Sequence, residues 1–174
     1  LDSWKIVEYQ MFYARFKAYQ VLVGQLIIER HKTKREPIRI RRKQGPRTTV
    51  RDMEWILDWE QRCQQPDIEE FVMNSKPTFG QDWELRVRHA PKDNRMVPIQ
   101  YAFISEHPSD IEMTIVPWMA MVVAQSFGAD TGAELYEALH AKVPVSKNDF
   151  VRAVCALVSV GVLRLPGVQA PDRT

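Results

Sequence analysis

A dense run of basic side chains between residues 30 and 51 has the clearest chemical character in the sequence. It holds ten Lys or Arg residues and a single acid, Glu36. Cations at this density neutralise phosphates and release condensed counterions, which is typical of a segment that contacts a nucleic-acid backbone. Clusters 34–35 and 41–43 also fit a nuclear address. The positions that we expect to contact phosphate are Lys32, Lys34, Arg35, Arg39, Arg41, Arg42, Lys43 and Arg47.

An acidic stretch follows at once and gives the basic run a second interpretation. Residues 52–84 contain nine Asp or Glu side chains against Arg62 and Lys76. If the basic segment folds back on this stretch, its charge is neutralised within the chain and no polyanion is needed. External phosphate contact and internal pairing both remain open from the sequence.

No residue pattern points to catalysis. Two cysteines, Cys63 and Cys155, are too few for a disulfide framework or a tetrahedral metal site and indicate a reducing compartment. The seven glycines do not cluster into a phosphate-binding loop. We therefore expect a protein that is not an enzyme and takes no cofactor, metal or small-molecule substrate. The histidines are far apart and lack helical metal-ligand spacing: His31, His89, His107 and His140.

A long amphipathic helix is predicted over residues 2–35. Two apolar stripes lie beside each other at helical spacing, one through Trp4 and Met11 and one through Phe12 and Phe16. A helix that is apolar over so much of its circumference must be covered, either by its own fold or by a partner chain. The helix is either a central core helix of this fold or a pairing helix in an assembly, and in the second case these four side chains are the ones expected to contact the partner protein.

A β-hairpin is predicted in the middle of the chain, after two helices within residues 50–72. Alternating residues indicate one strand over 83–88, a turn rich in Pro, Asp and Asn at 90–94, and a second strand over 96–104. Pro98 indicates an edge strand. The hairpin either extends the basic surface or presents a solvated face, because its polar face or tip carries Arg86, Arg88, Lys92 and Arg95.

Three short helices and a strand are predicted in the last third. Pro117 lies where a first helical turn accepts it, and Thr131 and Ser146 have the spacing of N-terminal caps. Gly161 ends the third helix, and a β-run follows at 162–165. This order is that of a winged-helix domain.

The third helix and the strand after it resemble a known family, the C-terminal winged helix of the third subunit of the origin recognition complex. The resemblance is confined to the C-terminal third, and the basic wing and second strand of that family are absent from residues 166–174. It implies a subunit of a replication-type or chromatin-type complex. The residues that carry it are Phe150, Val151, Arg152, Ala153, Val154, Leu157, Val160, Gly161, Val162 and Leu163.

The charge of this C-terminal region favours docking over base reading. Residues 111–174 carry five bases and six acids, whereas a winged helix that reads DNA places basic and amide side chains along its third helix and wing. Its first helix offers Trp118 to a partner protein, although the same side chain can fill the domain's own core.

The totals set the limits of the fold. The chain has 174 residues, 45% of them hydrophobic and 26% charged, which excludes wholesale disorder. We expect a mainly α fold with a small β component: a long N-terminal helix, a β-hairpin and a C-terminal winged helix. A linker-like composition at 106–110 divides it into residues 1–107, with the basic arm and hairpin, and residues 108–174, the winged helix. Because the sequence starts at Leu1, we expect a fragment or processed form.

Two functional hypotheses follow. In the first, the chain is a non-catalytic subunit of a nuclear complex associated with DNA or RNA, whose basic arm contacts the backbone while the winged helix docks partner subunits. In the second, it is purely a protein-interaction scaffold. No apolar run approaches the ~20 residues that a membrane span requires, so we expect no membrane partner.

Salt dependence separates the two hypotheses. Binding through six or more phosphates is expected to lose roughly a thousandfold in affinity between 50 and 200 mM salt. Replacing Arg39, Arg41, Arg42 and Lys43 by Glu is expected to abolish that binding, as measured by retention on duplex and single-stranded nucleic acid. Absence of retention at low salt would contradict the first hypothesis.

Overall fold

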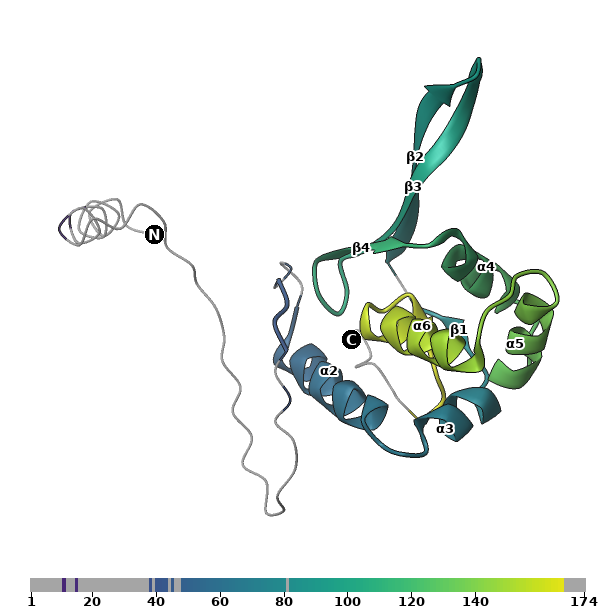
Figure 1. Cartoon of the computed structure of the whole chain (residues 1–174). Coiled ribbons are helices and arrows are strands. Elements are labelled where there is room, and N and C mark those ends of the chain that lie inside the picture. Colours follow the sequence, from purple (N-terminus) through teal and green to yellow (C-terminus); the bar gives the residue numbers. More distant parts are fainter. Residues whose placement is uncertain are drawn as a thin grey trace. The chain divides into compact units, whose positions relative to one another are not determined.

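The chain forms two compact units, residues 1–35 and residues 36–174. A computed structural model describes residues 11, 15, 38, 40–43, 45, 48–80 and 82–167. In the first unit it describes Met11 and Arg15, both helical and exposed. The remainder of the helix predicted over residues 2–35 lies outside the described residues. The elements that follow all belong to the second unit (Figure 1).

The described part is mixed α/β, with 43% helix and 24% strand. Both predicted secondary-structure types are present, but the strands are longer than the small β component that we expected. Its helices are α2 (Val50–Cys63), α3 (Ile68–Asn74), α4 (Pro117–Gln125), α5 (Gly132–His140) and α6 (Lys147–Ser159). Its strands are β1 (Thr78–Phe79), β2 (Trp83–Lys92), β3 (Arg95–Ser105), β4 (Ile111–Ile115) and β5 (Leu163–Arg164).

Helix α6 is the centre of the core. It begins at Ser146, whose side chain accepts a hydrogen bond from the Asp149 backbone N–H, as its cap spacing predicted. Helices α2 and α3 and strand β5 pack against it. Trp59 of α2 is fully buried there, and its indole N–H donates to the carbonyl oxygen of Cys155 at 3.1 Å. Burial of the ring and pairing of its one polar atom together fix α2 on α6.

Gly161 ends α6, as the sequence predicted. Its N–H donates to the carbonyl of Val158, and the N–H of Val162 donates to the carbonyl of Leu157, which is the paired pattern of a Schellman motif. The backbone of Gly161 has φ of +78°, and a Cβ there would lie 2.3 Å from the carbonyl oxygen of His107. The position therefore needs glycine for its backbone angle and for space.

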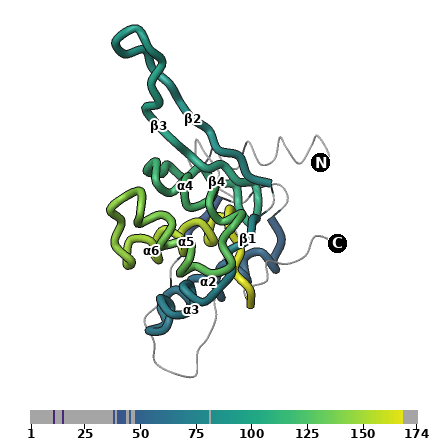
Figure 2. The backbone as a smooth tube through the Cα atoms, turned by 90° about the vertical axis from the view of Figure 1, so that its right-hand side faces the viewer, coloured from purple at the N-terminus to yellow at the C-terminus, as the bar shows by residue number. Residues whose placement is uncertain are grey.

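Strands β2, β3 and β4 form an antiparallel sheet, and β1 pairs with β5. Figures 1 and 2 show β2 and β3 continuing beyond β4 as a two-stranded ribbon that projects from the helices. The predicted turn over 90–94 is wrong in extent, because Asp93 and Asn94 alone make it, with φ of 50° and 59°. Left-handed geometry at both central positions gives a two-residue turn that lets the strands run to its base. Strand β4 was not predicted.

The loop from β3 to β4 is packed into the unit. His107, Pro108 and Ser109 are buried, although their composition predicted a linker. Nδ1 of His107 lies 3.5 Å from Oδ1 of Asp52, a buried carboxylate in the first turn of α2. Thr49 and Asp52 also form a capping box, with each side chain bonded to the other residue's backbone N–H. The boundary expected between 107 and 108 falls inside this loop, between two strands that pair with each other.

Substitution of glycines tests the packing at the end of α6. Gly161→Ala is expected to lower the free energy of unfolding by about 3 kcal/mol or more, because it adds backbone strain and a clash with the His107 carbonyl. Gly167→Ala is the matched control: its φ is +81° but no atom lies within 4 Å of the added Cβ. It is expected to cost about 1 kcal/mol. Equal losses for the two variants in urea unfolding would contradict the close approach.

Candidate interaction site

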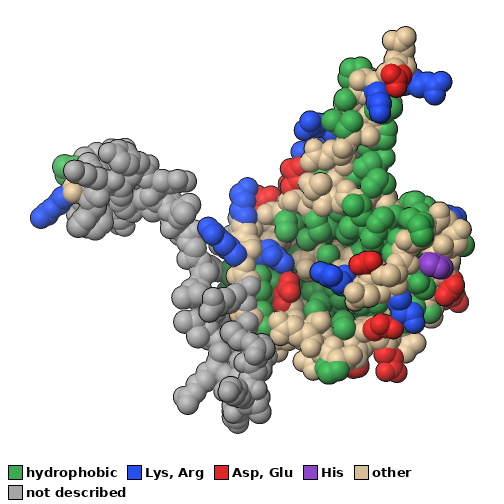
Figure 3. All heavy atoms as spheres, in the orientation of Figure 1, with side chains coloured by type: hydrophobic (Ala, Val, Ile, Leu, Met, Phe, Trp, Pro, Cys, Tyr) green, Lys and Arg blue, Asp and Glu red, His purple; other side chains and the backbone are tan. Residues whose placement is uncertain are grey.

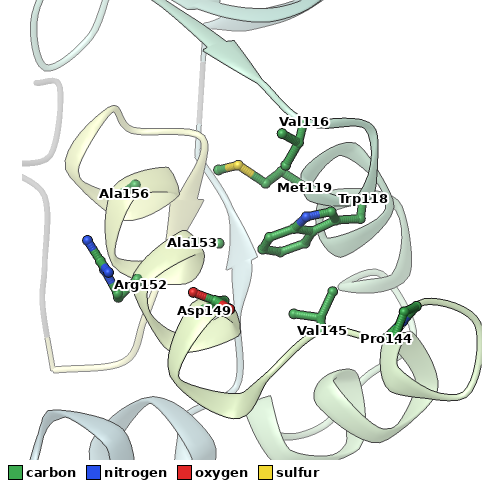
Figure 4. Close-up of a pocket in the computed structure, with 9 residues that line it drawn as sticks. All are labelled: Val116, Trp118, Met119, Pro144, Val145, Asp149, Arg152, Ala153 and Ala156. Carbon is green, nitrogen blue, oxygen red and sulfur yellow. The ribbon is translucent and has the colours of Figure 1, made fainter.

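A groove lies between the start of α4 and the exposed side of α6. Its volume is about 490 Å³, within the range of ligand pockets, and it is open to the surface. Figure 4 shows the indole of Trp118 reaching from α4 toward α6, with the Pro144–Val145 loop below it. The residues that line it are Val116, Trp118, Met119, Pro144, Val145, Asp149, Arg152, Ala153 and Ala156.

Local sequence explains the two walls. Pro117 is the first residue of α4, so Val116, Trp118 and Met119 come together at its start. On the opposite wall Ala153 and Ala156 are three positions apart on α6, so they lie on one face, and their methyl groups leave space. The space of the groove on the α6 side is therefore left by the small side chains of Ala153 and Ala156.

The floor of the groove is held by α5. The carbonyl oxygen of Val145 accepts a hydrogen bond from the Tyr136 hydroxyl at 3.4 Å and lies 3.0 Å from Nδ1 of His140. The Tyr136 ring also packs against Phe150 at 5.4 Å between ring centroids. These contacts attach the loop before α6, and the start of α6 itself, to α5.

Two charged residues of α6 stand beside the apolar walls. The Asp149 carboxylate already has a partner, because it accepts a hydrogen bond from the Ser146 hydroxyl at 2.7 Å. Arg152 is exposed on the outer side of α6, and within the part of the chain that the structure describes its guanidinium has no ion-pair partner (Figure 4). The groove is thus an apolar cleft to whose lining Arg152 contributes, while its guanidinium extends along the outer side of α6, away from Trp118 (Figure 4).

The basic segment is described at three of its eight expected phosphate contacts. Arg42 makes an ion pair with Glu60 of α2 at 3.1 Å, and Lys43 pairs with Asp110. The backbone N–H of Asp110 donates to the carbonyl of Lys43, so this stretch is attached to the β3–β4 loop. Arg41 is exposed and has no ion-pair partner among the described residues. Of these three described residues, Arg42 and Lys43 are paired internally, and Arg42 alone pairs with the acidic stretch 52–84.

Of the other site residues predicted from the sequence, two lie among the residues that the structure describes and eight lie outside them. Trp118 is half-buried and lines the groove. Met11 is in a helical conformation and is 65% exposed. Glu substitutions at 42 and 43 would now place like charges against Glu60 and Asp110, so Ala is the better replacement for a binding test. The positions outside the described residues are Trp4, Phe12, Phe16, Lys32, Lys34, Arg35, Arg39 and Arg47.

Two cysteines that seemed unrelated in the sequence share a hydrogen bond. The Cys63 thiol donates to Cys155, which raises the pKa of Cys63 and lowers the pKa of Cys155. Burial also raises the pKa of Cys63. Both are free thiols and half-buried. No spacing signal finds this pair, because it arises from the packing of α2 on α6.

Comparison with known proteins finds no matching family model, no matching curated protein and no matching solved structure. Among the residues that the structure describes, no group of three His, Cys, Asp or Glu side chains is placed to hold a metal ion. The described helices also include none with the length and apolar character needed to cross a bilayer.

Alkylation tests the thiol pair. Because the lowered pKa leaves more thiolate on Cys155, iodoacetamide is expected to modify Cys155 at a lower pH than Cys63, as followed by mass spectrometry across a pH series. Cys63→Ala removes the donor and is expected to shift the Cys155 profile to higher pH. The converse variant, Cys155→Ala, is expected to shift the Cys63 profile to lower pH. Identical profiles for both thiols in the wild type would contradict the hydrogen bond.

Proposed function

We propose that the chain is a non-catalytic subunit of a nuclear, nucleic-acid-associated complex, and that a partner protein docks in the groove between α4 and α6. The groove is the observation that carries the proposal. It is mostly apolar, it has the volume of a binding pocket, and Trp118 forms one wall. Trp and Arg are the side chains most enriched among those that dominate binding energy at protein interfaces.

The chemistry of the groove defines its occupant. The apolar lining around Trp118 favours a bulky apolar side chain, and the exposed Arg152 cation on the outer side of α6 favours a carboxylate in the same partner segment. We therefore assign the groove to a partner segment that carries an apolar anchor flanked by Asp or Glu. Val116, which also lines the groove, is 47% exposed and adds to its accessible apolar surface.

The proposal includes a winged-helix fold for the C-terminal third, as the resemblance to the origin recognition complex subunit implies. The order α4, α5, α6, β5 supports it. Two features depart from that pattern: β5 is two residues long, and it pairs with β1, which lies between α3 and β2, before the three helices α4 to α6. A replication or chromatin role rests on the resemblance alone.

Contact with a phosphate backbone through the basic segment belongs to the same proposal. The Lys43 side chain is 77% exposed despite its ion pair, and Arg41 is exposed, so both cations are accessible to a polyanion. Exposed ion pairs contribute little, so a phosphate can compete with Asp110 for Lys43. The alternative is a protein-interaction scaffold without nucleic-acid contact, which the pairs made by Arg42 and Lys43 favour.

Charge reversal in the groove tests the docking role. Arg152→Glu repels the acidic partner segment and Ala156→Lys fills the cleft, so each is expected to weaken recovery of the partner about thirtyfold, a loss of about 2 kcal/mol. The measurement is quantitative mass spectrometry of proteins that co-purify with the tagged full-length chain.

Lys142→Glu provides the matched control, because it makes the same charge change at an exposed position outside the groove. It is expected to recover the same partners as the wild type. Thermal unfolding of all three variants establishes that the fold is retained. Equal recovery by the groove variants and the wild type would refute the docking role of this groove.

A further inference from the structure

The β2–β3 ribbon has two chemically different faces, which follow from its register. Directly opposed residues in an antiparallel pair share a face, and residues alternate between faces along each strand. Arg88 opposes Gln100, and past a bulge at Ile99 the pair Lys92–Arg95 closes the ribbon. Strand β2 alternates without interruption, so Arg88 and Lys92 lie on the same face.

The opposite face is apolar. Val87 opposes Tyr101, and Pro91 opposes Met96, which is 65% exposed. In Figure 3, Lys and Arg side chains lie along one side of the ribbon and at its tip, while hydrophobic side chains run up the other side and also appear among the basic ones near the tip. We define the basic face as Arg88, Lys92, Arg95 and Gln100; the apolar pair Ala90–Val97 lies on the same face between them.

The cations of the basic face differ from Arg42 and Lys43 in that they have no ion-pair partner among the described residues. Arg86, nearer the base, is engaged by Glu84 at 2.8 Å and by Glu112 at 3.9 Å, so it is excluded from the face. Within the described chain Arg88, Lys92 and Arg95 have no ion-pair partner, and Asp93 in the turn is the one acid nearby. Arg88 donates to the Gln100 side chain, which in turn donates to Thr114, so the face is held in place at its base.

We propose that the basic face of the β2–β3 ribbon binds in the major groove of a DNA duplex. The major groove, about 12 Å wide, admits a two-stranded β-ribbon. Arg88 and Lys92 are four residues apart on one strand, about 13 Å, a reach that spans several phosphates along the duplex. Arg88 also has the side-chain type that recognises guanine in that groove, whereas both amide atoms of Gln100 are engaged by Arg88 and Thr114 and serve to hold the face.

The ribbon's projection from the helices supports this assignment (Figures 1 and 2). A narrow element that extends beyond the body can enter a groove without the body meeting the phosphate walls. Double-stranded RNA is a poor alternative, because its major groove is deep and too narrow for side chains to reach the bases. The inference uses a different surface from the α4–α6 groove and from the basic segment, so it fails or stands independently of them.

The test compares variants of the full-length chain by fluorescence anisotropy with a labelled DNA duplex of mixed sequence. Three phosphate contacts correspond to a slope of about 2.7 in log affinity against log salt, or about 40-fold between 50 and 200 mM. For the variant Arg88→Ala/Lys92→Ala/Arg95→Ala, the slope of log affinity against log salt is expected to be smaller than the wild-type slope by about 2.7. All three side chains are exposed, so thermal unfolding is expected to match the wild type.

Two controls separate the basic face from bulk charge and from the ribbon as a whole. Lys76→Ala/Lys142→Ala/Lys147→Ala removes the same charge from exposed positions on the helical part and is expected to leave the slope near the wild-type value. Leu85→Ala/Met96→Ala changes the apolar face of the same ribbon and is expected to leave affinity and slope unchanged.

Four outcomes would overturn the proposal. The first is an unchanged salt slope in the basic-face variant. The second is a loss of slope in either control as large as the loss in the basic-face variant. The third is equal affinity for an RNA duplex of the same sequence, which would indicate a general polyanion surface. The fourth is unchanged DNA binding together with loss of a co-purifying protein, which would assign the face to a protein partner.

Discussion

The contact between the β3–β4 loop and the carboxyl end of α6 determines how the second unit is arranged. Gly161 has no side chain, so the carbonyl of His107 lies against it, and the buried carboxylate of Asp52 faces the His107 imidazole. Strand β3 leads into this loop and β4 leads out of it toward α4. One packed junction therefore positions both the ribbon and one wall of the groove. The capping box with Thr49 also holds Asp52 in place, so the junction joins the start of α2 to the β3–β4 loop.

Local signals in the sequence predicted those parts of the fold that depend on local backbone groups. Thr131 and Ser146 cap their helices because a free N–H at a helix start needs an acceptor nearby, and Pro117 begins α4 because it has no N–H to leave unpaired. Gly161 ends α6 for a similar reason. The existence of the hairpin was also predictable, whereas the sequence left open whether Trp118 fills the core or faces a partner.

Features that depend on distant partners were not predictable. Residues 106–110 have the same polar composition whether they form a solvated linker or a packed loop, and only the position of Asp52 distinguishes the two. The same holds for the Cys63–Cys155 hydrogen bond and for the ion pair between Arg42 and Glu60. The extent of the strands was missed because Asp93 and Asn94 confine the turn to two residues. Composition alone does not specify a left-handed backbone at both positions.

The pairing of β1 with β5 joins residues 78–79 to residues 163–164. The ribbon can form as soon as its own strands leave the ribosome, since they are adjacent in the chain. By contrast, β1 has to wait for a strand that is synthesised after all five described helices. Assembly during translation is thus ordered, with the projecting element complete first and the body closed only by its final strand.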